Sequence, residues 1–272
     1  MPDVGRYVRM AKNRLRGRFA LQLRRPKDSV KRLLLSPVQQ EMQSESRTLL
    51  VAFGGLRGRI DVPPFEFLAL TGDFPIKRLY VRDLDQAWYH RGAPRTRARN
   101  LEELAGVLLE IVAAQEVDRI VTIGNSSGGY AALAFGTLLG ADTVLAFAPQ
   151  TVIDPETMEA MDDRRWLDKL ATLDDRGALD HAWTDLAVAL PGARRSPTRY
   201  QIYFDDSHRV DRLHAEHLRD VEGVRLYRFG KGGHYLVNRM RASGALERVV
   251  RNAVGAPRPL DPAPDIGTPG SG

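Results

Sequence analysis

The chain has 272 residues, 43% of them hydrophobic, which is enough for one large α/β domain or for two small ones. It contains no cysteine, which excludes disulfides, a thiolate nucleophile and a cysteine metal site, and fits a reducing cytoplasm. No apolar run reaches the length of a transmembrane helix, and no apolar signal segment follows the basic N-terminus. We therefore expect a cytoplasmic protein, either free or peripheral at the inner face of the membrane.

The positive charge is concentrated at one end of the chain. Residues 1–32 contain eleven Lys and Arg against two Asp, or 11 − 2 = +9, and the rest carries (40 − 11) − (34 − 2) = −3. We expect residues 1–46 to form a basic extension, in which 4–25 is either a basic amphipathic helix or a solvated arm. Residues 1–32 would then contact an anionic membrane surface or another acidic partner. The acidic body offers no second basic surface, which argues against nucleic-acid binding.

Apolar strands alternate with helical segments over residues 47–254. This alternation predicts an α/β fold, a mainly parallel sheet with helices on both faces. Residues 150–197 are expected to form a helical cap insertion, and the Pro- and Gly-rich residues 255–272 a disordered tail. The predicted strands are 48–53, 77–81, 120–123, 143–147, 200–204 and 224–229, and the predicted helices are 101–114, 130–139, 164–173, 178–190, 212–221 and 235–254.

The segment RIVTIGNSSGGYAAL, residues 119–133, contains a Gly-x-Ser-x-Gly pattern between a strand and a helix. Gly124 and Gly128 lie two positions on either side of Ser126, whereas a register centred on the next serine would need a glycine at Asn125. So sharp a turn leaves no room for side chains at its flanks, and it exposes the serine hydroxyl. The segment predicts a nucleophile elbow with Ser126 as the nucleophile. The alternative is a small-residue turn that only lets strand and helix pack closely.

Candidate partners for this serine follow two later strands. A serine hydroxyl needs a base within hydrogen-bond reach, oriented by a third group, and such groups gather at the carboxyl ends of parallel strands. His234 lies in the glycine-rich loop after the last predicted strand and is the expected base. Asp206, in the turn directly after strand 200–204, is the predicted acid. Asp211, which could instead only cap a helix, and Asp205 are the alternatives.

The chain resembles the α/β-hydrolase superfamily over about residues 48–254. The resemblance rests on the segments AFGGL, RDxxxxWY and GNSSGGYAAL and on the order serine, aspartate, histidine. More loosely, it is similar to a poorly characterised, serine esterase-like bacterial branch of that superfamily. The resemblance implies Ser126 as nucleophile and His234 as general base and then general acid.

The resemblance also implies an oxyanion hole. One donor would be the backbone N–H of Ser127 and the other would come from the glycine loop after the first strand, where Leu56 N–H beside Gly55 is the expected donor. Loss of one such donor costs about two to three orders of magnitude in rate. Gly54 stands where the superfamily often has a histidine that is not catalytic.

Other polar and aromatic residues have two readings each. Trp88 and Tyr89 could line a substrate pocket, together with His90, or could pack beneath their loop. His208 could replace His234 as the base. His214 and His217 could suggest a metal, but we expect a solvated helix face, because no fourth ligand is apparent. We expect no metal and no cofactor, since the sequence has neither a P-loop nor a dinucleotide fingerprint.

These patterns predict a serine hydrolase that cleaves an ester or acyl bond through a Ser-His-Asp triad and a covalent acyl-enzyme. The expected substrate is a small-molecule or glycan-linked ester; the acyl and alcohol groups and the oligomeric state cannot be read from the sequence. The alternative is a non-catalytic scaffold or binding protein on a hydrolase fold, targeted by its basic arm. The complete set of serine, aspartate and histidine favours the enzyme.

Overall fold

The computed structural model describes residues 36–56, 67–193, 197–230 and 233–255. Apart from Gly255, the predicted tail lies outside these residues, as does most of the predicted basic extension. Among the described residues, no helix is both long and apolar enough to cross a membrane.

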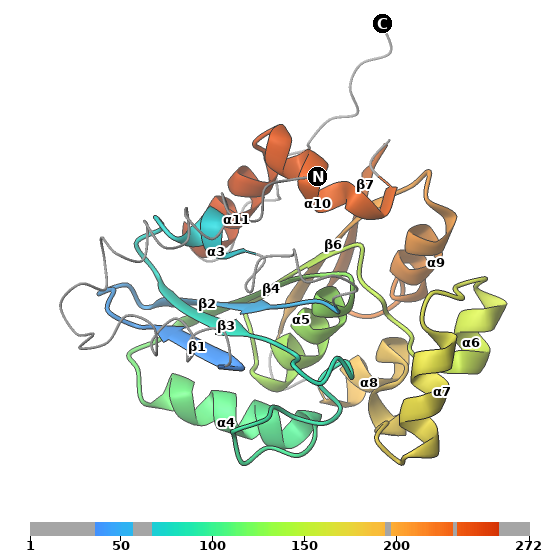
Figure 1. Ribbon diagram of the computed structural model, residues 1–272. Helices are drawn as coiled ribbons and strands as arrows, with labels where there is room; N and C mark the ends of the chain where they lie inside the picture. Colours follow the sequence, from blue (N-terminus) through green and yellow to red (C-terminus); the bar gives the residue numbers. More distant parts are fainter. Residues whose placement is uncertain (1–35, 57–66, 194–196, 231–232, 256–272) are drawn as a thin grey trace, which may run out of the picture.

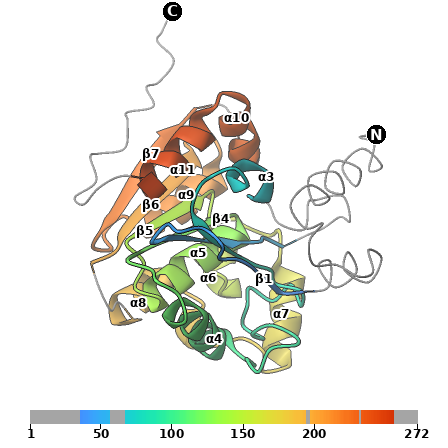
Figure 2. The same ribbon diagram turned by 90° about the vertical axis from the view of Figure 1, so that its left-hand side faces the viewer.

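The described strands form one sheet of seven, in the order β1-β3-β2-β4-β5-β6-β7 (Figure 1). All neighbouring pairs are parallel except β1 and β3, which are antiparallel. Figure 2 shows the sheet twisting from β1 at one end to β7 at the other. The strands are β1 (Val38–Glu41), β2 (Thr48–Phe53), β3 (Lys77–Val81), β4 (Arg119–Asn125), β5 (Thr143–Phe147), β6 (Arg199–Asp205) and β7 (Val224–Phe229).

Helices cover both faces of this sheet. On one face α4, α5 and α8 pack over a core that includes Leu104, Phe135 and Leu190; on the other, α3, α10 and α11 pack over Leu50 and Val250 (Figure 1). The helical elements are α3 (Leu68–Thr71), α4 (Leu101–Ala113), α5 (Ser127–Leu138), α6 (Pro155–Ala160), α7 (Leu167–Asp175), η1 (His181–Trp183), α8 (Leu186–Ala193), α9 (Arg209–His217), η2 (Gly233–Tyr235), α10 (Leu236–Ala242) and α11 (Ala245–Gly255).

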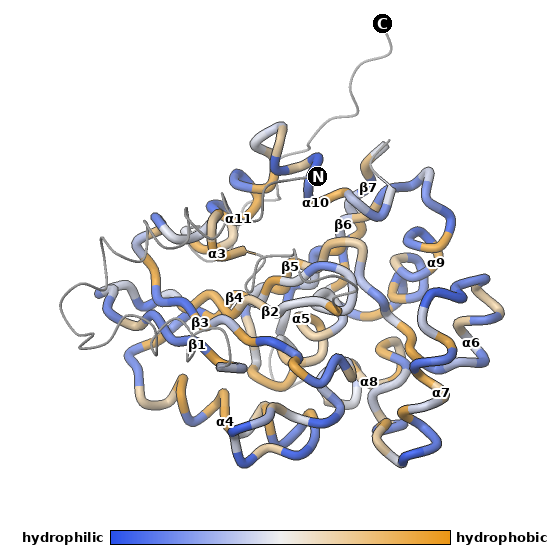
Figure 3. The backbone as a smooth tube through the Cα atoms, viewed as in Figure 1, coloured by the Kyte–Doolittle hydropathy of each residue, from blue (hydrophilic) through white to orange (hydrophobic). Residues whose placement is uncertain are grey.

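The predicted cap segment divides into two parts. Helices α6 and α7 lie beyond the sheet and mix hydrophilic residues with buried apolar ones such as Met158 and Leu170 (Figures 1 and 3), whereas α8 packs on α5. Only the part before α8 therefore projects over the edge at which the parallel strands end.

Several elements differ from the sequence-based expectation: α6 was not predicted, and the helix predicted over 178–190 is η1 followed by α8. β1 falls within the predicted extension because its sequence, VQQE, has a single apolar residue; only pairing with β3 makes it a strand. The helix predicted over 235–254 is two helices, α10 and α11, because Gly244 between them has a φ of +71°. The other predicted strands match to within two residues at each end.

Candidate active site

Ser126 lies in the sharp turn between β4 and α5. Its φ of 56° and ψ of −120° belong to a strained conformation that non-glycine residues rarely adopt. A Cβ on Gly124 would lie 1.8 Å from the Gly128 carbonyl oxygen, and one on Gly128 would lie 2.6 Å from the Phe53 carbonyl oxygen. The turn therefore requires glycine at both positions, as the predicted elbow does.

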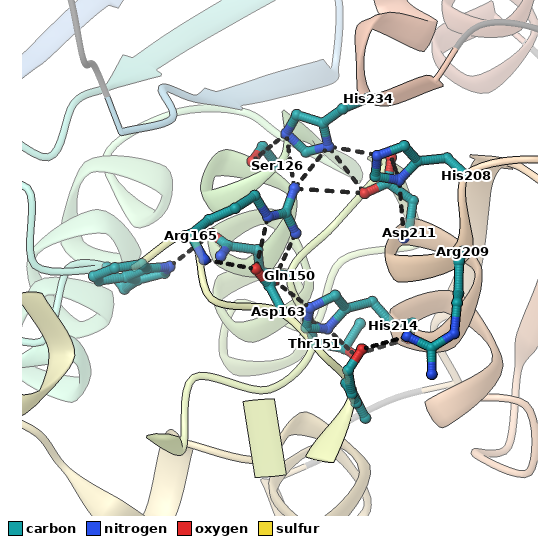
Figure 4. Close-up of polar contacts among 12 residues, drawn as sticks. Ser126, Gln150, Thr151, Asp163, Arg165, His208, Arg209, Asp211, His214 and His234 are labelled. Atoms are coloured by element: carbon teal, nitrogen blue, oxygen red, sulfur yellow. Dashed lines mark hydrogen bonds and ion pairs between the residues drawn. The ribbon is translucent and has the colours of Figure 1, made fainter. Parts of the chain in front are cut away.

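A chain of two hydrogen bonds joins Ser126 to a buried carboxylate (Figure 4). The Nε2 of His234 lies 3.1 Å from Ser126 Oγ, and its Nδ1 lies 2.9 and 3.1 Å from the two carboxylate oxygens of Asp211. Because an ionised carboxylate only accepts, it assigns the ring proton to Nδ1 and leaves Nε2 to accept the serine hydroxyl. The Asp211 side chain is 1% exposed, so this bond is shielded from water.

The carboxylate that contacts His234 belongs to Asp211, so the prediction of Asp206 as the triad acid is wrong. The Asp206 side chain is 47% exposed, and its nearest cation is Arg228 at 3.9 Å. Asp206 N–H also donates to the Phe229 carbonyl oxygen, which continues the pairing of β6 with β7 past the predicted strand end. The first turn of α9, where Asp211 lies, is the segment that comes back to the histidine.

Asp205, the remaining alternative for the triad acid, binds the backbone of the loop that carries His234. Its buried carboxylate accepts from the backbone N–H of Gly233, directly before His234. The other oxygen accepts from the backbone and the hydroxyl of Ser207 at 2.8 and 2.7 Å. Asp205 therefore positions the loop that leads into His234.

Solved structures share this arrangement of sheet and helices, whereas no protein-family model and no curated protein matches the chain. A capsule O-acetyltransferase of Neisseria meningitidis serogroup A is 12% identical, with 77% of this chain and 90% of that chain covered and a TM-score of 0.54. An S-formylglutathione hydrolase from Agrobacterium tumefaciens is 12% identical, with 80% and 95% covered and a TM-score of 0.51. The chain has the α/β-hydrolase fold. Carboxyl esterase 2 from Tuber melanosporum is also similar, with 13% identity, 80% and 82% covered and a TM-score of 0.51.

The glycine loop of this α/β-hydrolase fold contacts the elbow. Leu56 N–H donates to the Ser127 hydroxyl at 2.5 Å, and a Cβ on Gly55 would lie 3.1 Å from the Asn125 carbonyl oxygen and 3.3 Å from Ser127 Oγ. The structure thus brings Ser127, Leu56 and Gly55 together beside Ser126. In this state the Leu56 N–H is engaged by the Ser127 hydroxyl.

Arg165 enters the site from the segment between α6 and α7, and the sequence analysis missed it. Its Nε and Nη2 donate to the Asp163 carboxylate at 2.8 and 2.6 Å. Its Nη1 lies 3.1 Å from Nδ1 and 3.5 Å from Nε2 of His234, and 3.7 Å from Asp211 Oδ1. Figure 4 shows the guanidinium between His234 and Asp163.

Asp163 anchors this arginine from a fully buried position. Burial acts to raise the pKa of Asp163, but hydrogen bonds from Arg165 and His214 outweigh it and hold the pKa well below its usual range. In the sequence the run DDRR at 162–165 has the appearance of solvated charge. No local signal distinguishes Asp163 and Arg165 from their exposed neighbours.

The histidines of α9 join that helix to the cap segment. His214 is fully buried, with Nε2 3.0 Å from Asp163 Oδ2 and Nδ1 3.2 Å from Thr151 N. His217 lies 2.7 Å from Asp185. The expectation of a solvated face is therefore wrong for His214, because the cap segment covers it. Within the described ranges, no group of three or more His, Cys, Asp or Glu could hold a metal.

His208 caps α9 and does not reach the serine in any contact of the structure. Its Nδ1 accepts from Asp211 N–H at 3.3 Å, and its ring centre is 6.1 Å from that of His234. This position leaves His234 as the base.

Trp88 and Tyr89 do not line a pocket; the packing alternative holds. Their side chains are 0% and 1% exposed. The Tyr89 hydroxyl donates to the Gly54 carbonyl oxygen at 2.8 Å, and Trp88 Nε1 donates to Gln150 Oε1 at 3.0 Å. The two residues have positive φ values of 50° and 66°, so the loop is folded tightly under the glycine loop.

Two cavities lie among the described residues. A cavity of about 160 Å³ adjoins the glycine loop and is lined by Gly54, Gly55, Arg82, Asp83, Leu84 and Gln86. A cavity of about 500 Å³ lies elsewhere, between β1 and α4, where it is lined by residues such as Val38, Val107 and Ile111. Neither of these two cavities is lined by Ser126, His234 or Asp211.

Proposed function

We propose that the protein is a serine hydrolase that cleaves an ester or acyl bond through a covalent acyl-enzyme on Ser126. The observation that supports it most is the chain from Ser126 Oγ through His234 to Asp211, with distances of 3.1 and 2.9 Å. A serine in this arrangement is activated by its neighbouring base. A binding protein would need neither this alignment nor the strained serine backbone.

In the proposed mechanism, Ser126 Oγ attacks the carbonyl carbon while His234 Nε2 takes the hydroxyl proton. Asp211 stabilises the imidazolium that forms. The tetrahedral oxyanion would accept from the Ser127 backbone N–H at the start of α5 and from Leu56 N–H once the Ser127 hydroxyl releases it. His234 then protonates the leaving alcohol, and water releases the acyl group by the reverse sequence.

The substrate class within this proposal is a small-molecule or glycan-linked ester. The similar proteins are named as an O-acetyltransferase, an S-formylglutathione hydrolase and a carboxyl esterase, so their names span transfer and hydrolysis. At 12–13% identity these names give no substrate for this chain.

Labelling with a fluorophosphonate probe, followed by p-nitrophenyl acetate turnover, tests the proposal. We expect the probe to modify Ser126 and turnover to fall at least about a thousandfold in Ser126→Ala and His234→Ala. His181→Ala is the matched control, because this histidine is 71% exposed and contacts Asp174. A folded wild-type protein that takes up no probe would contradict the proposal and favour a scaffold role.

A further inference from the structure

Arg165 has no part in the proposed mechanism, yet it is the cation that contacts His234. Its side chain is 31% exposed, so it is reachable from outside the site. It comes from the cap segment, whereas the nucleophile, base and acid come from β4–α5, η2 and α9.

The guanidinium is held in one orientation before any ligand arrives. Two of its nitrogens are bound by Asp163, and the buried Asp163 also accepts from His214. A planar guanidinium bound along one edge directs its remaining nitrogen, here Nη1, the opposite way. Little rotamer entropy would therefore be lost when Nη1 binds a group in the site.

The position of Nη1 identifies the side of the ester that it would meet. His234 Nε2 is the atom that returns a proton to the leaving alcohol, and Nη1 lies 3.5 Å from it and 3.1 Å from Nδ1 of the same ring. The proposed oxyanion donors lie elsewhere: Ser127 N–H is at the start of α5, and Leu56 N–H is in the glycine loop. An ester aligned for reaction therefore places its alcohol portion, and not its acyl oxygen, next to Arg165.

A carboxylate lies on each side of the Arg165 guanidinium. Asp163 binds its inner edge, and Asp211, which is paired with His234, lies 3.7 Å from the outer nitrogen Nη1. A second donor, the side-chain amide of Gln150, lies nearby. Its Oε1 accepts from Trp88 Nε1, and Trp88 packs edge-on against Trp166 with the ring centres 6.1 Å apart. The Gln150 Nε2 is buried and has no acceptor among the described residues.

Resting on the proposed function, we propose that Arg165 determines specificity by binding an anionic group, a carboxylate or phosphate, on the alcohol portion of the ester. Nη1 would donate to an anionic oxygen a few bonds from the scissile oxygen. Charge-assisted hydrogen bonds of this kind are about twice as strong as neutral ones. In this role Arg165 leaves the chemistry of acyl cleavage unchanged and selects which ester binds.

The test compares acetoxyacetate with acetoxyacetamide, which share the acetyl group and shape and differ by one negative charge. We expect the wild type to prefer the anion at least about tenfold in kcat/KM, and Arg165→Met to abolish this preference by raising KM for the anion. Arg165→Lys should keep part of it. Arg164→Met is the control. The side chain of Arg164 is 72% exposed, so its removal should leave the ratio of the two kcat/KM values unchanged. A third ester, 2-acetoxyethyl phosphate, shows whether phosphate or carboxylate is favoured.

The outcomes separate this inference from the proposed function. Probe labelling of Ser126 with no preference for the anion, or equal loss on both esters in Arg165→Met, would overturn the inference alone and make Arg165 a positioning residue. Absence of labelling would overturn both. Because Arg165→Met leaves Asp163 without its main partner, the double variant Asp163→Asn/Arg165→Met, checked by thermal unfolding, repeats the test in a protein with no unpaired buried carboxylate.

Discussion

The carboxylate of Asp211 has the surroundings that an ionised triad acid requires. It lies in the first turn of α9, where the helix N-terminus favours a negative charge. His234 lies at 2.9 Å and Arg165 at 3.7 Å. Asp206, five residues earlier, has one cation at 3.9 Å and is half exposed.

Asp211→Asn should therefore lower kcat by about three to four orders of magnitude, because an amide can stabilise the wrong imidazole tautomer. Asp206→Asn is the matched control, and its kcat should stay within about twofold of wild type. Turnover of p-nitrophenyl acetate by the two purified variants measures both effects. The opposite ranking would show that the acid is Asp206 and that the α9 contact is not used.

At the scale of elements, a buried chain of hydrogen bonds joins the loop after β3 to α5 and to the segment before α8. Asp180 N–H donates to His90 Nδ1 at 2.9 Å, so Nε2 carries the ring proton and lies 2.8 Å from the Tyr130 hydroxyl. That hydroxyl donates to the Trp183 carbonyl oxygen at 2.8 Å. Each member of the chain is satisfied only when His90 is neutral, and burial lowers the pKa of His90 to about 4.

Acidification should therefore loosen this connection. Unfolded His90 takes up a proton below about pH 6.5 and folded His90 only below about 4, so stability is lost as pH falls through this window. Between pH 7 and 5 we expect wild type to lose about 2 kcal/mol more unfolding free energy than His90→Gln. Urea titrations at both pH values measure the difference.

Comparison with His90→Gln is needed because Asp83 acts in the opposite direction. Burial raises the pKa of Asp83 to about 6, so its protonation favours the folded state as pH falls. Asp83 is present in both proteins, so its contribution cancels. Equal losses in wild type and variant would contradict the proposed role of His90.

For the whole molecule, the main asymmetry is in charge: +9 within residues 1–32 and −3 in the remainder. The triad spans positions 126–234, well separated in sequence from the basic residues. We propose that the basic residues bring the protein to an anionic membrane surface or another acidic partner, and that catalysis does not need them.

Removal of residues 1–35 should abolish sedimentation with vesicles containing phosphatidylglycerol and leave p-nitrophenyl acetate turnover within about twofold. Binding by the full chain should disappear at 1 M salt, where the Debye length is about 3 Å, and with vesicles of phosphatidylcholine alone. Unchanged sedimentation of the shortened chain would place the membrane contact elsewhere. Preference for duplex DNA over anionic vesicles would identify a nucleic-acid partner.

The sequence by itself determined the features that depend on neighbouring residues. Runs such as TLLVAF and TVLAF are apolar enough to be buried strands whatever surrounds them, and both have the predicted bounds. The elbow is also local, because the glycines at 124 and 128 are required by backbone atoms within or beside the turn. The α/β class with a mainly parallel sheet followed from these elements and their order, and the α/β-hydrolase expectation followed from the resemblance that the motifs carry.

Only the tertiary structure decided which side chains meet. Asp205, Asp206 and Asp211 are equivalent in type, and the path of the chain from β6 into α9 selects the one that faces His234. Arg165 reaches the same histidine across 69 positions of sequence because a cap turn brings it there. Such meetings depend on packing among distant segments, whereas strand formation and the elbow depend on residues a few positions apart.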